Sequence, residues 1–519
     1  MAPAPHVWFR TLVVAVAAAV TFGGLATVPA AAVVDPTPAP ATTSATTTES
    51  DSPPVAEAGT LRWQRCRSAG LAQARCAKLR VPLDPADPSG PTIRIALSRV
   101  AHTSSDRKYR GVLLLNPGGP GGSGLRMSTT NNSLPAKVAG RYDWIGFDPR
   151  GVGASRPHLS CRPSYTGFAR PDYYPKPKAN ADRWLKRSAK YARACERNGG
   201  ALLNHMRTTD VAADMDRIRA ALGADRLNFL GFSYGTYLGQ VYATLFPGRV
   251  GRMVLDSNVD PQRAFYQANL DQDVAMQRVL NKWFRWVARK NGEFGLGRSA
   301  KVVAERFDRT QDRLRRHPAG GKIGPAEWTD IFNQVTYSMF AWRPLAQLFG
   351  NYRETGKSKD LVQAFKGTSM YGDDNTYAVY NAVQCTDAPW PDRWSAWKRD
   401  NWATYRDGPN FTWMNVWFNA PCLYWPVAAG PRVTVGNDSP LLLVGGSDDG
   451  ATPFTGSLTV RRLFPQSSLV ELKKTVSHAV GLTNRCSRTW ISRYLSSGEL
   501  PQRKPGDRPD VRCDREAGT

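Results

Sequence analysis

The sequence predicts an α/β protein with a mostly parallel central sheet, helices on both faces of that sheet, and a helical cap insertion. Two observations carry this prediction. Short apolar runs typical of buried strands alternate with helical patterns up to about residue 258, which indicates parallel strands covered on both faces. Between residues 259 and 425 the pattern is instead helical and rich in aromatic side chains, and strand-like runs return only after it. One interrupted domain accounts for both.

The first 32 residues have the organisation of a secretory signal peptide. His6 and Arg10 precede an apolar stretch at 11–28, and small residues follow it. A retained membrane anchor is the alternative, but the stretch is short and is interrupted by polar residues and glycines. Residues 33–58 are rich in Thr, Ala and Pro and predict a disordered linker. We therefore expect a secreted, extracellular protein.

The expected elements follow in chain order. A first core segment covers 59–258, the cap covers 259–425, and a second core segment covers 426–519. Helical patterns lie at 211–222, at 236–243 and at 488–495. The runs that predict strands lie at 93–97, 111–115, 142–147, 226–230, 253–255, 440–444 and 469–472.

The chain is strongly basic, with 69 Lys and Arg against 43 Asp and Glu, or a net charge of +26 over 519 residues. Nucleic acid is the first partner that such a charge suggests. The arginines are scattered, however, and no nucleic-acid-binding motif is present, so we expect no nucleic-acid partner. Electrostatic association with anionic cell-envelope polymers, including the cell wall, fits better. We expect a monomer.

Eight cysteines in an exported chain indicate disulfide bonds, because export places them in an oxidising compartment. No C-x-x-C motif or Cys/His cluster has the spacing of a zinc site, so we expect no metal. Their grouping along the chain favours pairing in sequential order. The expected pairs are Cys66 with Cys76, Cys161 with Cys195, Cys385 with Cys422, and Cys486 with Cys513.

The pentapeptide Gly231-Phe232-Ser233-Tyr234-Gly235 lies directly between a predicted strand and a predicted helix. This is the setting of a nucleophile elbow, in which a tight turn presents a serine hydroxyl at the start of a helix. The turn leaves room only for small residues two positions before and after the nucleophile. Ser233 is therefore the expected nucleophile.

A serine hydroxyl needs a base to take its proton and an acid to orient that base. Of six histidines, His478 is the one that follows the last predicted strand, as the chain order serine, acid, histidine requires. The loop after the preceding strand contains Asp448 and Asp449, and only one of them can face the imidazole. We assign Asp449, with Asp448 as the alternative.

Two backbone N–H groups are expected to form an oxyanion hole. One belongs to Tyr234, which follows the nucleophile. The second should come from the glycine-rich loop at 116–124, where we assign Gly119, with Gly118 as the alternative. The loop lacks the G-K-[ST] ending of a phosphate-binding loop, and we expect no cofactor.

These motifs together resemble those of the secreted tripeptidyl aminopeptidases, a branch of the α/β-hydrolase serine peptidases related to prolyl aminopeptidases. The matching features span about residues 60 to 515: the loop 116–124, the segment 148–155, the elbow, Asp449-x-x-Thr452-Pro453, and His478 with Cys486 after it. Two departures concern the site. Ser477 stands where the family usually has glycine, and Asp448 adds a second acid to the acid loop.

The resemblance implies an α/β-hydrolase fold and an enzyme that releases short peptides, often tripeptides, from a free amino terminus. Such an enzyme needs a carboxylate for the substrate ammonium group. Among the cap acids we choose Asp387, Asp373 and Glu327, with Asp260, Asp271, Asp273 and Asp374 as further candidates. A carboxylester hydrolase would use the same three catalytic residues, and a non-enzymatic envelope-binding protein is the third hypothesis.

Overall fold

A computed structural model describes residues 61–68, 70–368 and 371–515, so the predicted signal peptide and linker lie outside the described residues. Ten strands of the described part form one sheet, with the order β1-β2-β3-β5-β4-β6-β7-β8-β9-β10. The strands are β1 (Gln64–Arg65), β2 (Arg75–Pro82), β3 (Thr92–Val100), β4 (Val112–Asn116), β5 (Asp143–Asp148), β6 (Leu227–Phe232), β7 (Val250–Asp256), β8 (Leu442–Gly446), β9 (Ser468–Leu472) and β10 (Val511–Cys513).

The prediction of a mostly parallel sheet is confirmed. All strand pairs from β5–β4 through to β9–β10 are parallel, whereas β1–β2, β2–β3 and β3–β5 are antiparallel. The seven predicted strand runs correspond to β3 through β9. The sequence analysis missed β1, β2 and β10. In β2 charged side chains alternate with apolar ones, because this strand lies near one edge of the sheet.

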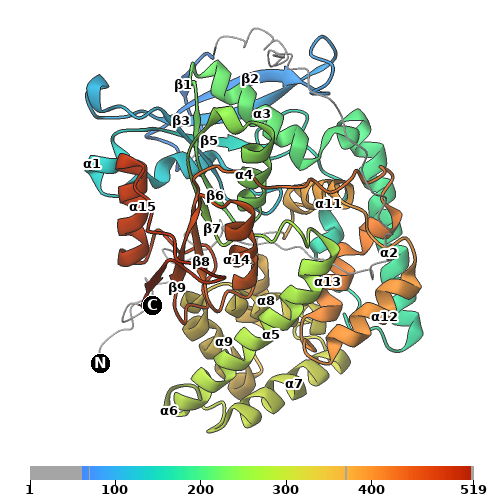
Figure 1. Cartoon of the computed structure of the whole chain (residues 1–519). Coiled ribbons are helices and arrows are strands. Elements are labelled where there is room, and N and C mark those ends of the chain that lie inside the picture. The colour runs from blue at the N-terminus through green and yellow to red at the C-terminus, as the bar shows by residue number, and fades with distance from the viewer. Residues whose placement is uncertain (1–60, 69, 369–370, 516–519) are drawn as a thin grey trace, which may run out of the picture.

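Helices cover both faces of the sheet (Figure 1). On one face, α3 (Thr208–Ala221), α4 (Tyr234–Leu245) and α14 (Phe454–Leu463) pack against the strands, and on the other face α1 (Ala136–Ala139) and α15 (Arg485–Ser497) do so. Consecutive residues of β4 divide between the two layers: Leu114 belongs to the first core cluster, whereas Leu113 and Leu115 belong to the second. This alternation is the period-2 pattern of a strand buried on both faces.

Between β7 and β8 the described elements are helical, in the region where the sequence predicts a cap. These helices are α5 (Tyr266–Arg289), α6 (Asn291–Phe294), α7 (Ala300–Arg316), α8 (Pro325–Asn333), α9 (Trp342–Thr355), α10 (Lys359–Lys366), α11 (Asn375–Asp387), α12 (Trp394–Tyr405) and α13 (Thr412–Asn419), with the 3-10 helices η6 (Gln334–Thr336), η7 (Met339–Ala341) and η8 (Ala420–Tyr424). Their aromatic side chains form a separate core.

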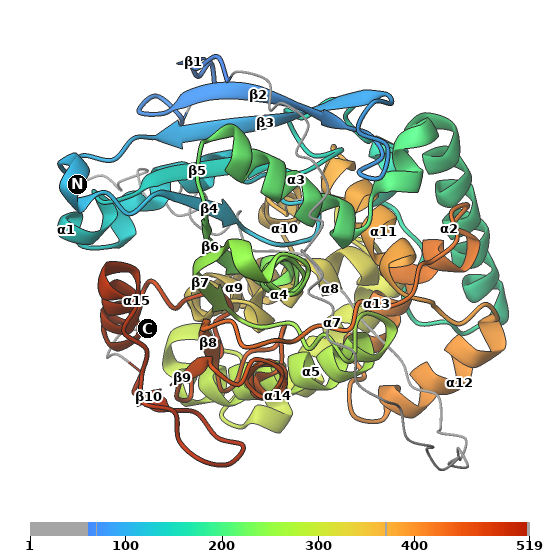
Figure 2. The ribbon, with the colours of Figure 1, turned by 45° about the horizontal axis from the view of Figure 1, so that its top comes forward.

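One helix from the first core segment packs in part with the cap. Helix α2 (Lys178–Gly199) lies beside α11, α12 and α13 in Figure 2, and its Trp184 ring stacks on Trp417 of α13 at a centroid distance of 5.9 Å. This helix therefore links the first core segment to the cap. Sequence order could not show this, because α2 joins the cap only through tertiary packing.

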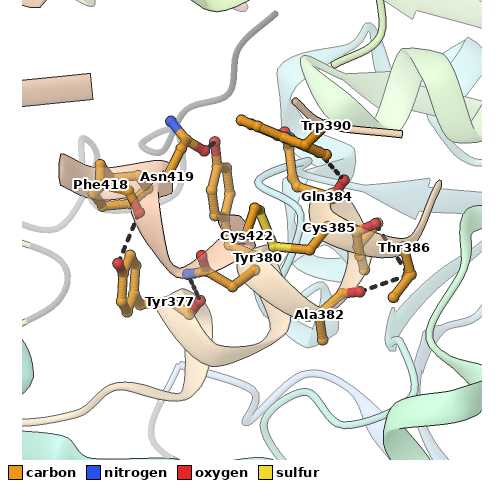
Figure 3. The surroundings of a disulfide bond; sticks show 12 residues. Tyr377, Tyr380, Ala382, Gln384, Cys385, Thr386, Trp390, Phe418, Asn419 and Cys422 are labelled. Carbon is orange, nitrogen blue, oxygen red and sulfur yellow. Dashed lines mark hydrogen bonds between the residues drawn. A yellow bond between two sulfur atoms is a disulfide. The ribbon is translucent and has the colours of Figure 1, made fainter. Parts of the chain in front are cut away.

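The four predicted disulfide pairings are confirmed: Cys66–Cys76, Cys161–Cys195, Cys385–Cys422 and Cys486–Cys513. Among the described residues no cysteine is left unpaired. Cys385–Cys422 joins α11 to η8 inside the cap (Figure 3). In the described part of the chain, no helix is both long enough and apolar enough to cross a lipid bilayer.

Replacing both Cys385 and Cys422 with serine should lower the free energy of unfolding by about 2–5 kcal/mol, because the bond closes a loop between positions 37 apart in the sequence. Urea unfolding followed by tryptophan fluorescence measures this change. The same double substitution at Cys66 and Cys76, which are only 10 positions apart, is the control with the smaller expected loss. Equal losses from the two pairs would contradict this prediction.

Candidate active site

Ser233 alone joins strand β6 to helix α4. Its backbone has φ 56° and ψ −125°, a conformation that a side-chain-bearing residue rarely adopts and that costs about 1–3 kcal/mol. The surrounding structure enforces it: the Ser233 N–H donates to the carbonyl oxygen of Asp256, at the end of β7, over 3.0 Å. The turn thus places the serine at the N-terminus of α4, where unpaired backbone N–H groups and the helix dipole favour negative charge.

The two glycines of the elbow are required by close packing. A Cβ atom on Gly231 would lie 2.4 Å from the carbonyl oxygen of Gly235, and one on Gly235 would lie 2.8 Å from the carbonyl oxygen of Asn116. Neither neighbour can move, since both atoms are backbone. The sequence argument for small residues at these positions therefore has a direct structural basis.

Asp449 and His478 form a buried pair. The imidazole Nδ1 lies 2.8 Å from one carboxylate oxygen of Asp449 and 3.1 Å from the other. The carboxylate also accepts the backbone N–H groups of Ala451 at 2.8 Å and Thr452 at 3.1 Å, and the Thr452 hydroxyl at 3.1 Å. Asp448 points elsewhere and pairs with Lys282 of the cap helix α5. The loop thus presents Asp449, not Asp448, to the histidine.

The surroundings of His478 stabilise its protonated form. Burial alone would lower the pKa of the imidazolium, but the charge of Asp449 and its hydrogen bond outweigh burial, so the pKa is raised above its usual range. A second buried carboxyl lies close by. Asp256 accepts the Gly481 N–H at 2.7 Å, and burial raises the pKa of this carboxyl to about 7. The sequence analysis did not single out Asp256, although its place at the end of a strand was a usable signal.

The two residues assigned to the oxyanion hole lie together. Gly119 and Tyr234 line one pocket with Ser233. Tyr234 is the first residue of α4, so its N–H has no acceptor within the helix. The Gly118 N–H, in contrast, donates to the Asn116 side chain at 2.8 Å, whereas no hydrogen bond ties the Gly119 N–H to another described residue. This geometry favours Gly119 over Gly118.

The pocket has a cavity volume of about 50 Å³ and takes its walls from both the core and the cap. Its polar walls include two carboxylates, Asp260 and Asp271. The remaining lining residues include Arg263, Phe265, Ala268, Gln272, Tyr337, Gln384, Ala451, Thr452 and Pro453. Among the described residues, no group of three or more His, Cys, Asp or Glu is placed to hold a metal ion.

None of the three carboxylates expected to bind the substrate lines this pocket. Glu327 is fully buried, accepts the Gly324 N–H at the start of α8, and pairs with Arg170 at 3.2 Å. Asp373 is exposed and accepts the backbone N–H of Asn375 at 2.9 Å.

Asp387 is buried below the elbow. Its carboxylate accepts the backbone N–H of Thr208 at 2.7 Å and the Thr208 hydroxyl at 2.5 Å, and that hydroxyl lies 2.6 Å from the Tyr234 phenol oxygen. Burial raises the pKa of Asp387 to about 7. This carboxyl therefore supports the residue after the nucleophile rather than a ligand.

Three hydrogen bonds tie the cap to the loops that carry Asp449 and His478. Gln272 of α5 donates from Nε2 to the Ala451 carbonyl at 2.6 Å. The His478 N–H donates to the Tyr337 carbonyl at 2.8 Å. Ser477, where this chain departs from the family it resembles, accepts the Met339 N–H on its hydroxyl oxygen at 3.0 Å. The cap therefore helps to position Asp449 and His478.

Comparison with known proteins agrees with this geometry. Residues 111–484 match the family described as alpha/beta hydrolase fold. The chain belongs to the alpha/beta hydrolase family. It is 40% identical over 455 residues to a tripeptidyl aminopeptidase of Streptomyces lividans, covering 85% of this chain and 83% of that protein.

Two mycobacterial relatives are more distant. Serine protease Hip1 of Mycobacterium tuberculosis is 30% identical over 85% of this chain and 89% of its own length. Carboxylesterase B of the same organism is 30% identical over 85% of this chain and 88% of its own length. The likeness to aminopeptidase and protease relatives makes this member of the family a serine hydrolase of the aminopeptidase type.

Asp449→Asn should reduce kcat by about 10⁴-fold, since the amide neither fixes the histidine tautomer nor stabilises the imidazolium. Because Asp449 raises the pKa of His478, its loss should also move the acid limb of kcat/KM, where the base becomes protonated, to lower pH. Asp448→Asn is the matched control and should leave both quantities close to wild type. A larger loss from Asp448→Asn would identify Asp448 as the acid.

Proposed function

We propose that the protein is a secreted serine exopeptidase that releases short peptides, predominantly tripeptides, from free amino termini. The observation that carries the proposal is the composition of the pocket. It combines Ser233 with the Gly119 and Tyr234 backbone and with two carboxylates. The Streptomyces relative named tripeptidyl aminopeptidase supports the peptide class, and the four disulfides support export.

In the proposed mechanism the Ser233 hydroxyl attacks the carbonyl carbon of the scissile amide while His478 takes the hydroxyl proton. The N–H groups of Gly119 and Tyr234 stabilise the negative oxygen of the tetrahedral intermediate. His478 then gives its proton to the leaving amine, and the C–N bond breaks to leave an ester on Ser233. Water, deprotonated by His478, hydrolyses that ester and regenerates the serine. Asp449 stabilises the imidazolium in both halves of the cycle.

The carboxylates in the pocket supply the amino-terminal anchor in this proposal. Asp271 already pairs with the Arg263 guanidinium. Asp260 accepts the Gln262 N–H and the Thr459 hydroxyl, each at 2.9 Å, and no Lys, Arg or His nitrogen of the described chain lies within ion-pair distance of it. A substrate ammonium group would supply the missing cation. We therefore assign Asp260 as the anchor in place of Asp387, Asp373 and Glu327, with Asp271 as the second choice.

Carboxylester hydrolysis is the second candidate, because the mycobacterial relative named carboxylesterase B covers the same share of this chain. The same nucleophile, base and oxyanion hole would cleave esters. Matched tripeptide esters and anilides with a free amino group separate the two activities. Cleavage of the esters alone would favour the second candidate.

Ser233→Ala should abolish turnover, with a loss of about 10³-fold or more, because the attacking oxygen is removed. The test is hydrolysis of a free-amine tripeptide anilide, together with labelling by a fluorophosphonate, which should also disappear. Thermal unfolding should change little, since alanine is small enough for the elbow. A variant that retained a tenth of wild-type activity would exclude Ser233 as the nucleophile.

Free-amine tripeptide anilides should be cleaved faster than their N-acetylated counterparts by about tenfold to a hundredfold in kcat/KM. Acetylation removes a charge-assisted bond and leaves the anchoring carboxylate unpaired in the pocket. Asp260→Asn should erase most of this preference. Asp373→Asn, an exposed carboxyl away from the pocket, is the matched control and should keep the full preference. Equal rates on both substrates in the wild type would contradict recognition of the amino terminus.

A further inference from the structure

Gln384 joins the wall of the pocket from the last turn of α11. It lines the same cavity as Ser233 and Gly119, and the whole residue is only 2% exposed. No role is predicted for Gln384 from the sequence, and it takes no part in the proposed mechanism. Its side-chain amide carries both an acceptor and donors, so it can form hydrogen bonds with a bound molecule.

The amide oxygen of Gln384 lacks a hydrogen-bond donor. Within the described residues, Oε1 is buried and unpartnered, whereas Gln272, the other glutamine of the pocket wall, has its oxygen paired with Asn415 at 3.2 Å. Leaving a buried acceptor unpaired is unfavourable, so such groups are rare in folded proteins unless they have a ligand or a water molecule as partner. A bound ligand with an N–H group would remove that cost.

The backbone at this position is held from two sides. Cys385, the next residue, forms the disulfide to Cys422 of η8, and the Trp390 indole N–H donates to the Gln384 carbonyl at 2.7 Å. Figure 3 shows both constraints around the end of α11, with the indole of Trp390 directed at that carbonyl. An acceptor on a fixed backbone loses less entropy when it binds, so it discriminates better between ligands.

We propose that Gln384 binds the substrate, by accepting a backbone N–H of the bound peptide on its Oε1, and that it thereby favours peptides over esters. The inference rests on the proposed peptidase function. A site built to bond an N–H group rejects an analogue that lacks it, because the site's own acceptor is then left unpaired. An ester in place of that amide offers only an oxygen and cannot donate. Gln384 would therefore be a specificity-determining residue.

The test compares tripeptide anilides with depsipeptide analogues in which one amide N–H, that of the second or of the third residue, is replaced by an ester oxygen. For Gln384→Met, a substitution of similar size, we expect kcat/KM on the all-amide substrate to fall about threefold to tenfold. On the depsipeptide that lacks the N–H bonded by Gln384, wild type and Gln384→Met should have the same kcat/KM. Gln384→Glu, which keeps an acceptor oxygen, should retain more of the discrimination than Gln384→Met.

A matched control lies one turn earlier on α11. Asn381 is also a buried amide with an unpartnered oxygen, but it does not line the pocket. Asn381→Leu should lower kcat/KM, if at all, by the same factor on every substrate. Fluorophosphonate labelling of Ser233 in each variant, expected to match wild type, shows that the fold and the nucleophile are intact.

The outcomes separate the two proposals. If wild-type enzyme cleaves none of the tripeptide anilides, the proposed function itself fails. The assignment of Gln384 is overturned if wild type is active but Gln384→Met lowers kcat/KM by the same factor on every substrate. It is also overturned if the substitution lowers kcat/KM on none of them. It is likewise overturned if the loss disappears only when the terminal amine is replaced by a hydroxyl group, since the donor would then be the ammonium rather than a backbone N–H.

Discussion

The backbone conformation of Ser233 is the constraint around which the site is arranged. Holding one residue at positive φ between β6 and α4 demands glycine at 231 and 235, because backbone oxygens lie within 2.8 Å of any Cβ placed there. It also demands a fixed neighbour, and the carbonyl oxygen of Asp256 supplies it by accepting the Ser233 N–H. Because β7 supplies this acceptor and Asp256 also binds the Gly481 N–H, the elbow and the histidine loop share one support.

The cap contributes to the same support from the other side. The Gln272 side chain donates a hydrogen bond to the Ala451 carbonyl, and the Ala451 N–H donates one to the Asp449 carboxylate. Asp387, at the end of α11, accepts a hydrogen bond from the Thr208 hydroxyl, and that hydroxyl is also hydrogen-bonded to the phenol of Tyr234. The pocket wall and the Asp449–His478 pair therefore depend on the same helices, and substitutions deep in the cap should alter turnover as well as binding.

Local sequence patterns were sufficient for those parts of the site that local geometry determines. The elbow, the glycine loop and the order of serine, acid and histidine each follow from short-range sterics or from chain order, and Asp449 lies where that reasoning put it. The choice among the cap carboxylates could not be made from the sequence, because it depends on pairing across the fold. Glu327 is neutralised by Arg170 and Asp387 is bonded to Thr208, and neither partner lies near it in sequence. Gln384 gave no signal, since an unpaired oxygen is visible only in three dimensions.

The two hydrogen bonds between the cap and the histidine loop, from the His478 N–H to the Tyr337 carbonyl and from the Met339 N–H to the Ser477 hydroxyl oxygen, have a consequence for what the enzyme can digest. A lid that swung away to admit a bulky substrate would break the bond at the His478 N–H and displace the base. In the exopeptidase proposed above, this favours the entry of an extended chain end over the entry of a folded domain. Unfolded chains and short fragments would then be better substrates for the proposed exopeptidase than compact proteins.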